Sequence, residues 1–268
     1  MLPAASHDTC SVVGLPASAR SPLAGVGVAS ATVFLLLLVD AMRRPPGALD
    51  LETMRAVQRV ELPYLHALFD HLGLLTDSAG AIAAWFVACV ACLTMRWWLP
   101  LLGFLALPLA GVVNEGVGIF LATRDRPHLD VLTRTSANWE ERSFPSGHVV
   151  GAVVLYGFTW FLAGGSCSRW LRRVVRSVCA AIIGLSGFDR VWSGAHWPSD
   201  VVAAYALGTA LLMTLVLAYR WVDARLAVAA GPCGIPIDAF RGATGSRPCA
   251  VAPVRRLLAR AARPTDGD

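Results

Sequence analysis

The feature that most constrains the fold is a series of long apolar blocks separated by short polar stretches. Of the 268 residues, 56% are hydrophobic and only 15% are charged. A soluble domain of this size needs more charge on its surface, whereas a helix crosses a bilayer with about 20 apolar residues. We therefore expect an all-α polytopic membrane bundle. The blocks that predict its spans are residues 23–39, 79–95, 97–121, 149–163, 177–188 and 201–219.

Two of the six blocks are short for a membrane span. Block 149–163 still allows a crossing when its flanks snorkel, but block 177–188 is shorter, and segments of that length also form re-entrant loops. We predict six spans in a domain of residues 23–222, with an N-terminal tail over 1–22 and an Arg-rich tail over 223–268. Residues 1–22 lack the apolar core of a secretory signal peptide, so we expect the first block to be an uncleaved anchor.

The arginines predict the orientation in the membrane. All 23 basic residues are arginine, and four of them stand without an acid between the fourth and fifth blocks. By the positive-inside rule this loop and the C-terminal tail are cytoplasmic, so six spans place both termini inside. Arg43 and Arg44 oppose this assignment, but acidic residues accompany them. We expect an integral membrane protein whose net charge of +5 meets anionic lipids, with no nucleic-acid partner.

Residues 40–78 connect the first two predicted spans. Their apolar residues recur at helical spacing, which predicts an amphipathic helix on the bilayer or against the bundle, broken near Pro63. A packing role is as compatible with this pattern as a gate for lipid. The apolar positions are Leu51, Met54, Val57, Leu62, Leu65, Phe69 and Leu72.

Three polar clusters fall on one membrane face when the crossings are counted. Residues 123–127 end the third predicted span, and residues 143–148 (SFPSGH) begin the fourth. The chain then crosses twice and returns to the same face at residues 188–200, before the sixth span. The crossing pattern therefore gathers the clusters at a single surface.

The clusters contain residues suited to an anion. Ser146 is a natural N-cap for the fourth span, and Pro198 suits the first turn of the sixth, which also places Asp200 in that turn. Helix N-termini favour anions, and guanidinium groups such as those of Arg126 and Arg190 bind phosphate oxygens in pairs. Each residue alone would be an ordinary helix-start or interfacial residue, but their coincidence on one face predicts a phosphate site.

Two histidines add reactive groups to this site. Asp200 follows His196 by four residues, so on a helical turn its carboxylate could accept from one ring nitrogen while the other attacks phosphorus. His148, on another helix, would protonate the leaving oxygen. No set of metal ligands accompanies His196, and Cys89 and Cys92 are better read as packing residues. We expect neither a metal nor a cofactor.

These residues resemble a known family. Arg126-Pro127, the PSGH at residues 145–148, and Arg190, His196 and Asp200 in R-x5-H-x3-D spacing resemble the three-part signature of the type-2 phosphatidic acid phosphatase superfamily. The resemblance implies metal-independent phosphate ester hydrolysis through a phosphohistidine. It implies His196 as nucleophile, Asp200 as its orienting partner and His148 as general acid. The phosphate cradle that it implies consists of Arg126, Ser146, Gly147 and Arg190.

Two positions depart from the family pattern. Ile119 stands where the first motif usually has a lysine, and Arg124 is the candidate replacement for that cation. Asp189 stands where a serine usually precedes Arg190, and its charge opposes phosphate binding unless it is paired with Arg124 or Arg190. Glu115 lies inside the third predicted span beside Asn114, where an acid is costly, and structural and functional interpretations of it are equally open.

The expected function is hydrolysis of a lipid phosphate at the outer face, with membrane lipids as surroundings. The resemblance points to a polyprenyl diphosphate, a phosphatidate or a similar lipid, and to lipid recycling in cell-envelope synthesis. Two alternatives stay open: a phosphotransferase that uses the same intermediate, and a degenerate protein that binds or moves phospholipids. The sequence does not specify an oligomeric state.

Overall fold

The computed structural model describes residues 21–61, 63–122, 124–128, 132–135, 142–165 and 168–229. In these ranges the chain consists of helices and loops, with one isolated antiparallel bridge between Asp125 and Arg142. The all-α prediction is confirmed. Most of the two predicted tails, residues 1–20 and 230–268, lies outside the described residues.

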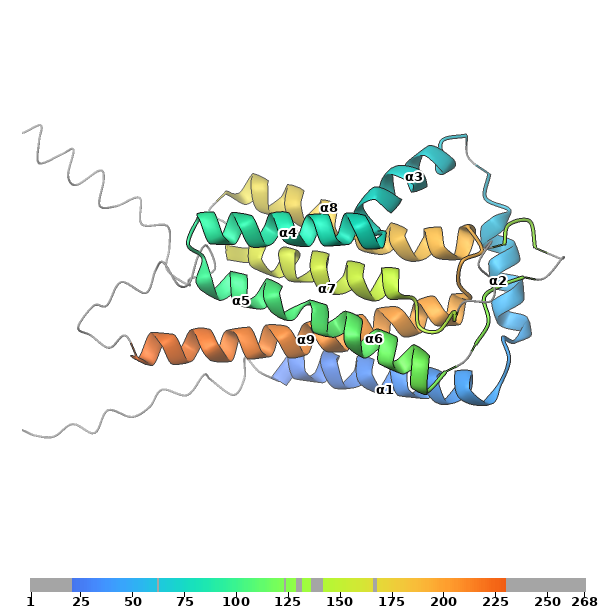
Figure 1. Cartoon of the computed structure of the whole chain (residues 1–268), viewed down its shortest axis with the longest axis horizontal. Coiled ribbons are helices and arrows are strands. Elements are labelled where there is room, and N and C mark those ends of the chain that lie inside the picture. Colours follow the sequence, from blue (N-terminus) through green and yellow to red (C-terminus); the bar gives the residue numbers. More distant parts are fainter. Residues whose placement is uncertain are drawn as a thin grey trace, which may run out of the picture.

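Helices occupy all six blocks from which spans were predicted. They run side by side along the long axis of the molecule, with α7 between the others (Figure 1). The helices of this bundle are α1 (Ser21–Arg43), α4 (Ser78–Thr94), α5 (Trp98–Ala106), α6 (Pro108–Phe120), α7 (Gly147–Leu162), α8 (Arg169–Trp192) and α9 (Pro198–Ala229).

Four of the described segments are long and apolar enough to cross a membrane: Pro22–Arg43, Trp98–Phe120, Gly147–Gly165 and Pro198–Leu226. The bent pair Leu65–Thr76 and Ser78–Thr94 would make a fifth if it counts as one span. These segments support an integral membrane protein. The count of six stays a prediction because α8 begins with the arginines of the basic loop, although it continues without a break for 24 residues.

The third predicted span is two helices joined end to end. α5 ends at Ala106 and α6 begins at Pro108, which lacks the backbone N–H that an uninterrupted helix would need there. Together they form one apolar segment of 23 residues. The interruption turns α6 so that its face lies beside the N-terminal half of α7 (Figure 1).

The segment between the first two spans contains two helices rather than one. α2 (Ala48–Gln58) lies across one end of the bundle, and α3 (Leu65–Thr76) inclines toward α4 (Figure 1). The break near Pro63 is where the sequence predicted it. Met54 in α2 and Phe69 and Leu72 in α3 are buried, so these helices pack against the bundle. Contact with a bilayer stays a prediction.

Small residues let the helices approach α7 closely. A methyl group added at Gly103 of α5 would lie 2.2 Å from Cζ of Phe158, which is fully buried on α7. Gly208 of α9 is similarly close to Val153 of α7. Small residues at helix contacts are typical of membrane bundles, where close backbone packing replaces a hydrophobic driving force.

The Gly103 contact generates a stability prediction. Gly103→Ala should lower the free energy of unfolding by about 1–3 kcal/mol, because the buried Phe158 ring must move to admit the methyl group. Gly116→Ala is the matched control, since nothing lies within 4 Å of a methyl group there. Thermal melting in detergent compares the two variants. Equal melting temperatures would contradict the close packing of α5 on α7.

Candidate active site

The three polar clusters lie at one end of the bundle, the end that α2 crosses (Figure 1). The first follows α6, the second precedes α7, and the third is the turn between α8 and α9. Direct hydrogen bonds join residues of all three clusters, as described below. The gathering that the crossing pattern predicted is therefore observed in the structure.

His196 lies in the turn between α8 and α9 and is 3% exposed. Its Nδ1 is 2.7 Å from the backbone carbonyl oxygen of Ser143. A carbonyl only accepts hydrogen bonds, so Nδ1 carries the proton and donates it. The lone pair of the neutral ring is then on Nε2. His196 lines the cavity described below, so a ligand in that cavity can contact this residue.

The surroundings of His196 keep the ring neutral. Burial and then the nearby charge of Arg126 lower the pKa of His196 to about 3, although its hydrogen bond to Ser143 acts in the opposite direction. A neutral imidazole is the nucleophilic form. The ring is therefore in its reactive protonation state at neutral pH.

Asp200 does not make the hydrogen bond to His196 that the spacing predicted. Its Oδ2 accepts from Ser143 Oγ at 2.5 Å and from the backbone N–H of Trp197 at 3.1 Å. Asp200 is the third residue of α9, and an acid there commonly bonds back to the residue before the helix. The group that orients the His196 ring is the Ser143 carbonyl, and Asp200 acts on it by holding the Ser143 side chain.

Arg124 also occupies a place different from the predicted one. Its Nη1 donates to Asp200 Oδ1 at 3.0 Å and to Ser199 Oγ at 2.7 Å, and its side chain is 4% exposed. A buried carboxylate needs such a counter-ion. Arg124 does not line the cavity, so the structure makes it the counter-ion of Asp200 rather than bringing it to the phosphate position.

The residues at the start of α7 are placed for a ligand. Ser146 is the N-cap residue, as predicted, but its side chain makes no capping hydrogen bond. Its Oγ is buried and has no hydrogen-bond partner among the described residues. Gly147 and His148 follow in the first turn and line the cavity, whereas Ser146 is not among the lining residues. A buried hydroxyl beside a helix N-terminus is suited to donate to an anion.

Arg190 pairs with two carboxylates. Its Nε donates to Asp189 Oδ2 at 2.9 Å, and its Nη2 donates to the same oxygen. The same Nη2 lies 3.9 Å from Asp77 Oδ1. Asp189 is thus paired, in one of the two ways that the sequence allowed. Arg190 is not among the cavity-lining residues, so its guanidinium must change partners to meet a phosphate there.

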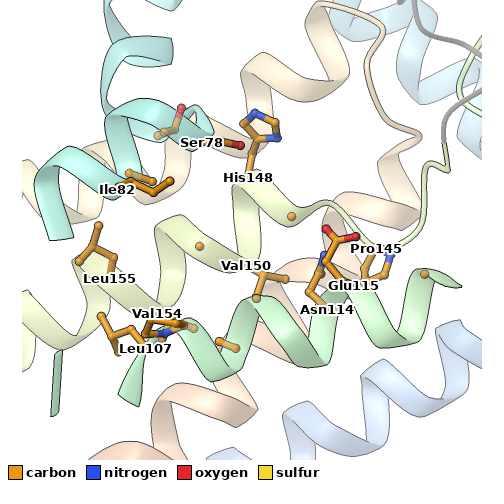
Figure 2. A pocket seen from close by; sticks show the side chains of 18 of the residues that line it. Ser78, Ile82, Leu107, Asn114, Glu115, Pro145, His148, Val150, Val154 and Leu155 are labelled. Atoms are coloured by element: carbon orange, nitrogen blue, oxygen red, sulfur yellow. The ribbon is translucent and has the colours of Figure 1, made fainter. Parts of the chain in front are cut away.

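A cavity of about 510 Å³ adjoins these groups. Arg126, His148 and His196 line its polar end, while residues of α4, α6 and α7 line the rest. Figure 2 shows His148 and Ser78 together, with Asn114, Glu115 and Pro145 on the neighbouring wall. Toward the interior of the bundle the wall becomes apolar. The labelled residues of that part are Ile82, Leu107, Val154 and Leu155.

Arg142 is a cavity-lining cation that the sequence analysis missed. Among the described arginines, it and Arg126 line the cavity, and Ile119 lies on the same wall. The bridge to Asp125 holds the Arg142 backbone beside the first polar cluster. Arg142, rather than Arg124, therefore supplies a second positive charge at the cavity, which Ile119, at the position of the missing lysine, also lines. Its place directly before Ser143 was the available signal.

Glu115 and Asn114 lie on the α6 wall at the junction between the polar and apolar parts (Figure 2). Glu115 makes no ion pair or hydrogen bond with the described residues, and the Oδ1 atom of the buried Asn114 is also without a partner there. An acid inside a membrane segment is rarely unpaired without a functional reason. Its place in the cavity favours the functional interpretation of Glu115.

Residues 97–226 match the family model of the PAP2 superfamily. The chain belongs to the PAP2 superfamily. Comparison with curated proteins gave no match.

Among the described residues, no group of three or more His, Cys, Asp or Glu side chains is arranged to hold a metal ion.

Two solved structures share the fold of this PAP2 chain. The transmembrane PAP2-type phosphatidylglycerolphosphate phosphatase of Bacillus subtilis superposes with a TM-score of 0.58 and 22% identity, covering 75% of this chain and 96% of that one. LpxE of Aquifex aeolicus gives a TM-score of 0.50 and 20% identity, covering 65% and 96%. At these identities the likeness establishes the helical architecture.

The low pKa of His196 predicts acid instability. The unfolded ring has a pKa near 6.5, so as the pH falls below that value the unfolded chain gains a proton that the folded chain does not. The free energy of unfolding should drop by about 2 kcal/mol between pH 7 and pH 5 through this group alone. Melting temperatures of the wild type should therefore fall more steeply than those of His196→Gln. Parallel curves would contradict a neutral buried ring.

Proposed function

We propose that the protein is a membrane lipid phosphatase that cleaves a phosphate ester through a phosphohistidine on His196. The observation that carries the proposal is the unprotonated Nε2 of a buried histidine in the same cavity as Arg126 and His148. Membership of the PAP2 superfamily supports the reaction class. The lipid phosphatase activity named for the Bacillus subtilis structure agrees with it.

The groups divide the reaction between them. Nε2 of His196 attacks phosphorus while its Nδ1–H stays on the Ser143 carbonyl, which fixes the ring and stabilises the charge that develops on it. His148 gives a proton to the leaving lipid oxygen and then takes one from the water that hydrolyses the phosphohistidine. Arg126, Ser146 Oγ and the first backbone N–H groups of α7 hold the phosphate oxygens. Arg190 joins them when its guanidinium releases Asp189.

The cavity supports a lipid substrate rather than a water-soluble one. Its polar end holds the reactive groups, and its continuation between α4, α6 and α7 is lined by apolar side chains (Figure 2). An acyl or prenyl chain fits this part while the head group meets His196. We propose that the polar end faces the outer side of the bacterial plasma membrane, as the arginine distribution predicts.

Glu115 bears on the kind of head group. A diphosphate would place a second anion beside the phosphate being cleaved, at the wall where Glu115 and the acceptor oxygen of Asn114 lie. Like charges at such a wall repel each other. We therefore favour a lipid with a single phosphate, such as phosphatidate, over a polyprenyl diphosphate.

The decisive measurement is phosphate release by detergent-solubilised protein across phosphatidate, phosphatidylglycerol phosphate and prenyl diphosphates. The wild type should turn over phosphatidate faster than the prenyl diphosphates, with or without EDTA. His196→Ala should abolish both turnover and the acid-labile phosphoenzyme, because the phosphoryl group is carried on Nε2 of His196 and His148 acts only as acid and base. Normal phosphoenzyme formation by His196→Ala would show that His196 is not the nucleophile. If the protein bound these lipids but released no phosphate, the result would indicate a phospholipid-binding or transport protein instead of an enzyme.

A phosphotransferase is the second candidate, because the phosphohistidine can be transferred to an alcohol instead of water. The apolar part of the cavity would admit a lipid alcohol as acceptor. With a diacylglycerol or prenol acceptor present, a hydrolase should still yield mainly inorganic phosphate. A new phospholipid as the main product would assign the transferase reaction instead.

A further inference from the structure

A carboxylate outside the polar clusters contacts His148. Asp77 lies at the bend of 53° between α3 and α4, before the residues that match the PAP2 family model. Its Oδ1 is 3.2 Å from Nε2 of His148. The His148 side chain extends toward the start of α4, beside Ser78 (Figure 2). The contact therefore joins the α3–α4 bend to the predicted general acid.

The bend fixes the backbone of Asp77. Its N–H donates to the carbonyl of Gly73 at 2.7 Å, and its own carbonyl accepts from the N–H of Ala81 at 2.7 Å. Gly73 is buried, and a methyl group there would lie 3.2 Å from Oδ2 of Asp77. The two helices therefore hold the backbone of Asp77 in place, and the absence of a side chain at Gly73 leaves room for its carboxylate.

The bend is attached to α7 at a second point. The hydroxyl of Tyr156 donates to the carbonyl of Leu75 at 2.8 Å. Tyr156 is eight residues after His148 on α7, which places both on the same helix face about two turns apart. Packing between α3, α4 and α7 thus holds the backbones of Asp77 and His148 at a fixed separation, and the His148 ring is only 27% exposed although the Asp77 side chain is 54% exposed.

Two simpler roles do not account for Asp77. It stands at the N-cap position of α4, but its side chain makes no capping hydrogen bond. It is also not the main partner of Arg190, because Arg190 Nη2 is 3.9 Å away from Asp77 and bonds directly to Asp189. The short contact of the carboxylate is with His148.

Resting on the phosphatase function proposed above, we propose that Asp77 is the positioning residue of His148, forming an Asp–His pair that keeps a proton on Nε2 and leaves Nδ1 to serve the reaction. A carboxylate only accepts, so Nε2–H points at Asp77 in both protonation states of the ring. The ring cannot then turn over, and the same nitrogen gives and takes the exchanged proton.

The proton balance follows from this arrangement. In the first step the bond from phosphorus to His196 Nε2 forms, the bond to the lipid oxygen breaks, and that oxygen takes the Nδ1 proton of His148. In the second step water attacks phosphorus, the bond to His196 breaks, and the proton of the water returns to Nδ1 of His148. His148 starts the first step doubly protonated, and its Nε2 keeps its own proton, hydrogen-bonded to Asp77, through both steps.

The first test compares leaving groups. In Asp77→Asn the amide can donate to Nε2 and turn or retautomerise the ring, so kcat/KM for a lipid phosphate should fall about 100-fold. With nitrophenyl phosphate, whose leaving group needs no proton, kcat/KM should change less than about 3-fold, while the phosphohistidine accumulates because its hydrolysis still needs His148. Asp70→Asn is the matched control, since it makes the same charge change on the exposed face of α3.

The second test asks whether Asp77 acts through His148. Asp77→Asn added to His148→Ala should lower activity no further than His148→Ala alone, because the residues work as one unit. The proposal would be wrong if the activity losses of the two single variants multiplied in the double variant. It would also be wrong if Asp77→Asn melted like the wild type but lost the same activity with both leaving groups.

A measurement on the wild type separates this inference from the proposed function. In ¹⁵N spectra of histidine-labelled protein, with His148→Gln to assign the signal, neutral His148 should be the Nε2–H tautomer. The Nδ1–H tautomer would overturn the pairing, whether or not Asp77→Asn folds. If the wild type releases no phosphate from any lipid, the phosphatase function fails, and this spectrum alone decides whether Asp77 holds His148.

Discussion

The buried carboxylate of Asp200 is the group on which the candidate site depends. It is 0% exposed, so each of its oxygens requires a partner. Those partners come from separate segments: Arg124 after α6, Ser143 before α7 and Trp197 before α9. Asp50 of α2 joins them by accepting from Ser199 in the first turn of α9. Satisfying this one charge brings the loops together, and the Ser143 carbonyl is thereby aimed at His196.

Much of the architecture was predictable because the bilayer leaves few choices. Apolar length located the helices, and the number of crossings placed Arg126, His148 and His196 at one end. The helix breaks at Pro63 and Pro108 differ in whether the sequence alone reveals them. Pro63 was recognised as a break in an amphipathic helical pattern, whereas Pro108 lies in a continuous apolar block and gave no sign that α5 and α6 are separate helices.

The contacts within the site were less predictable, because spacing along a helix does not say which neighbour wins a hydrogen bond. Asp200 is four residues from His196, yet the hydrogen bond of the ring nitrogen goes to a backbone carbonyl from a distant segment. Arg124 and Arg142 have the same side chain and flank the same polar clusters, but only the packing of Asp200 decides which of them is buried as a counter-ion. Asp77 belongs to no motif, and its contact with His148 exists because α3 and α4 meet at an angle.

The gradient along the cavity, from charged groups to aliphatic ones, also affects what happens after bond cleavage. A dephosphorylated lipid gains nothing from the arginines and has its chain already among hydrocarbon neighbours, so it leaves by diffusing sideways into the bilayer. Inorganic phosphate has the opposite solubility and departs into water. In the reaction proposed above, the two fragments would thus separate into different phases, and their recombination would be rare even where the dephosphorylated lipid is abundant in the membrane.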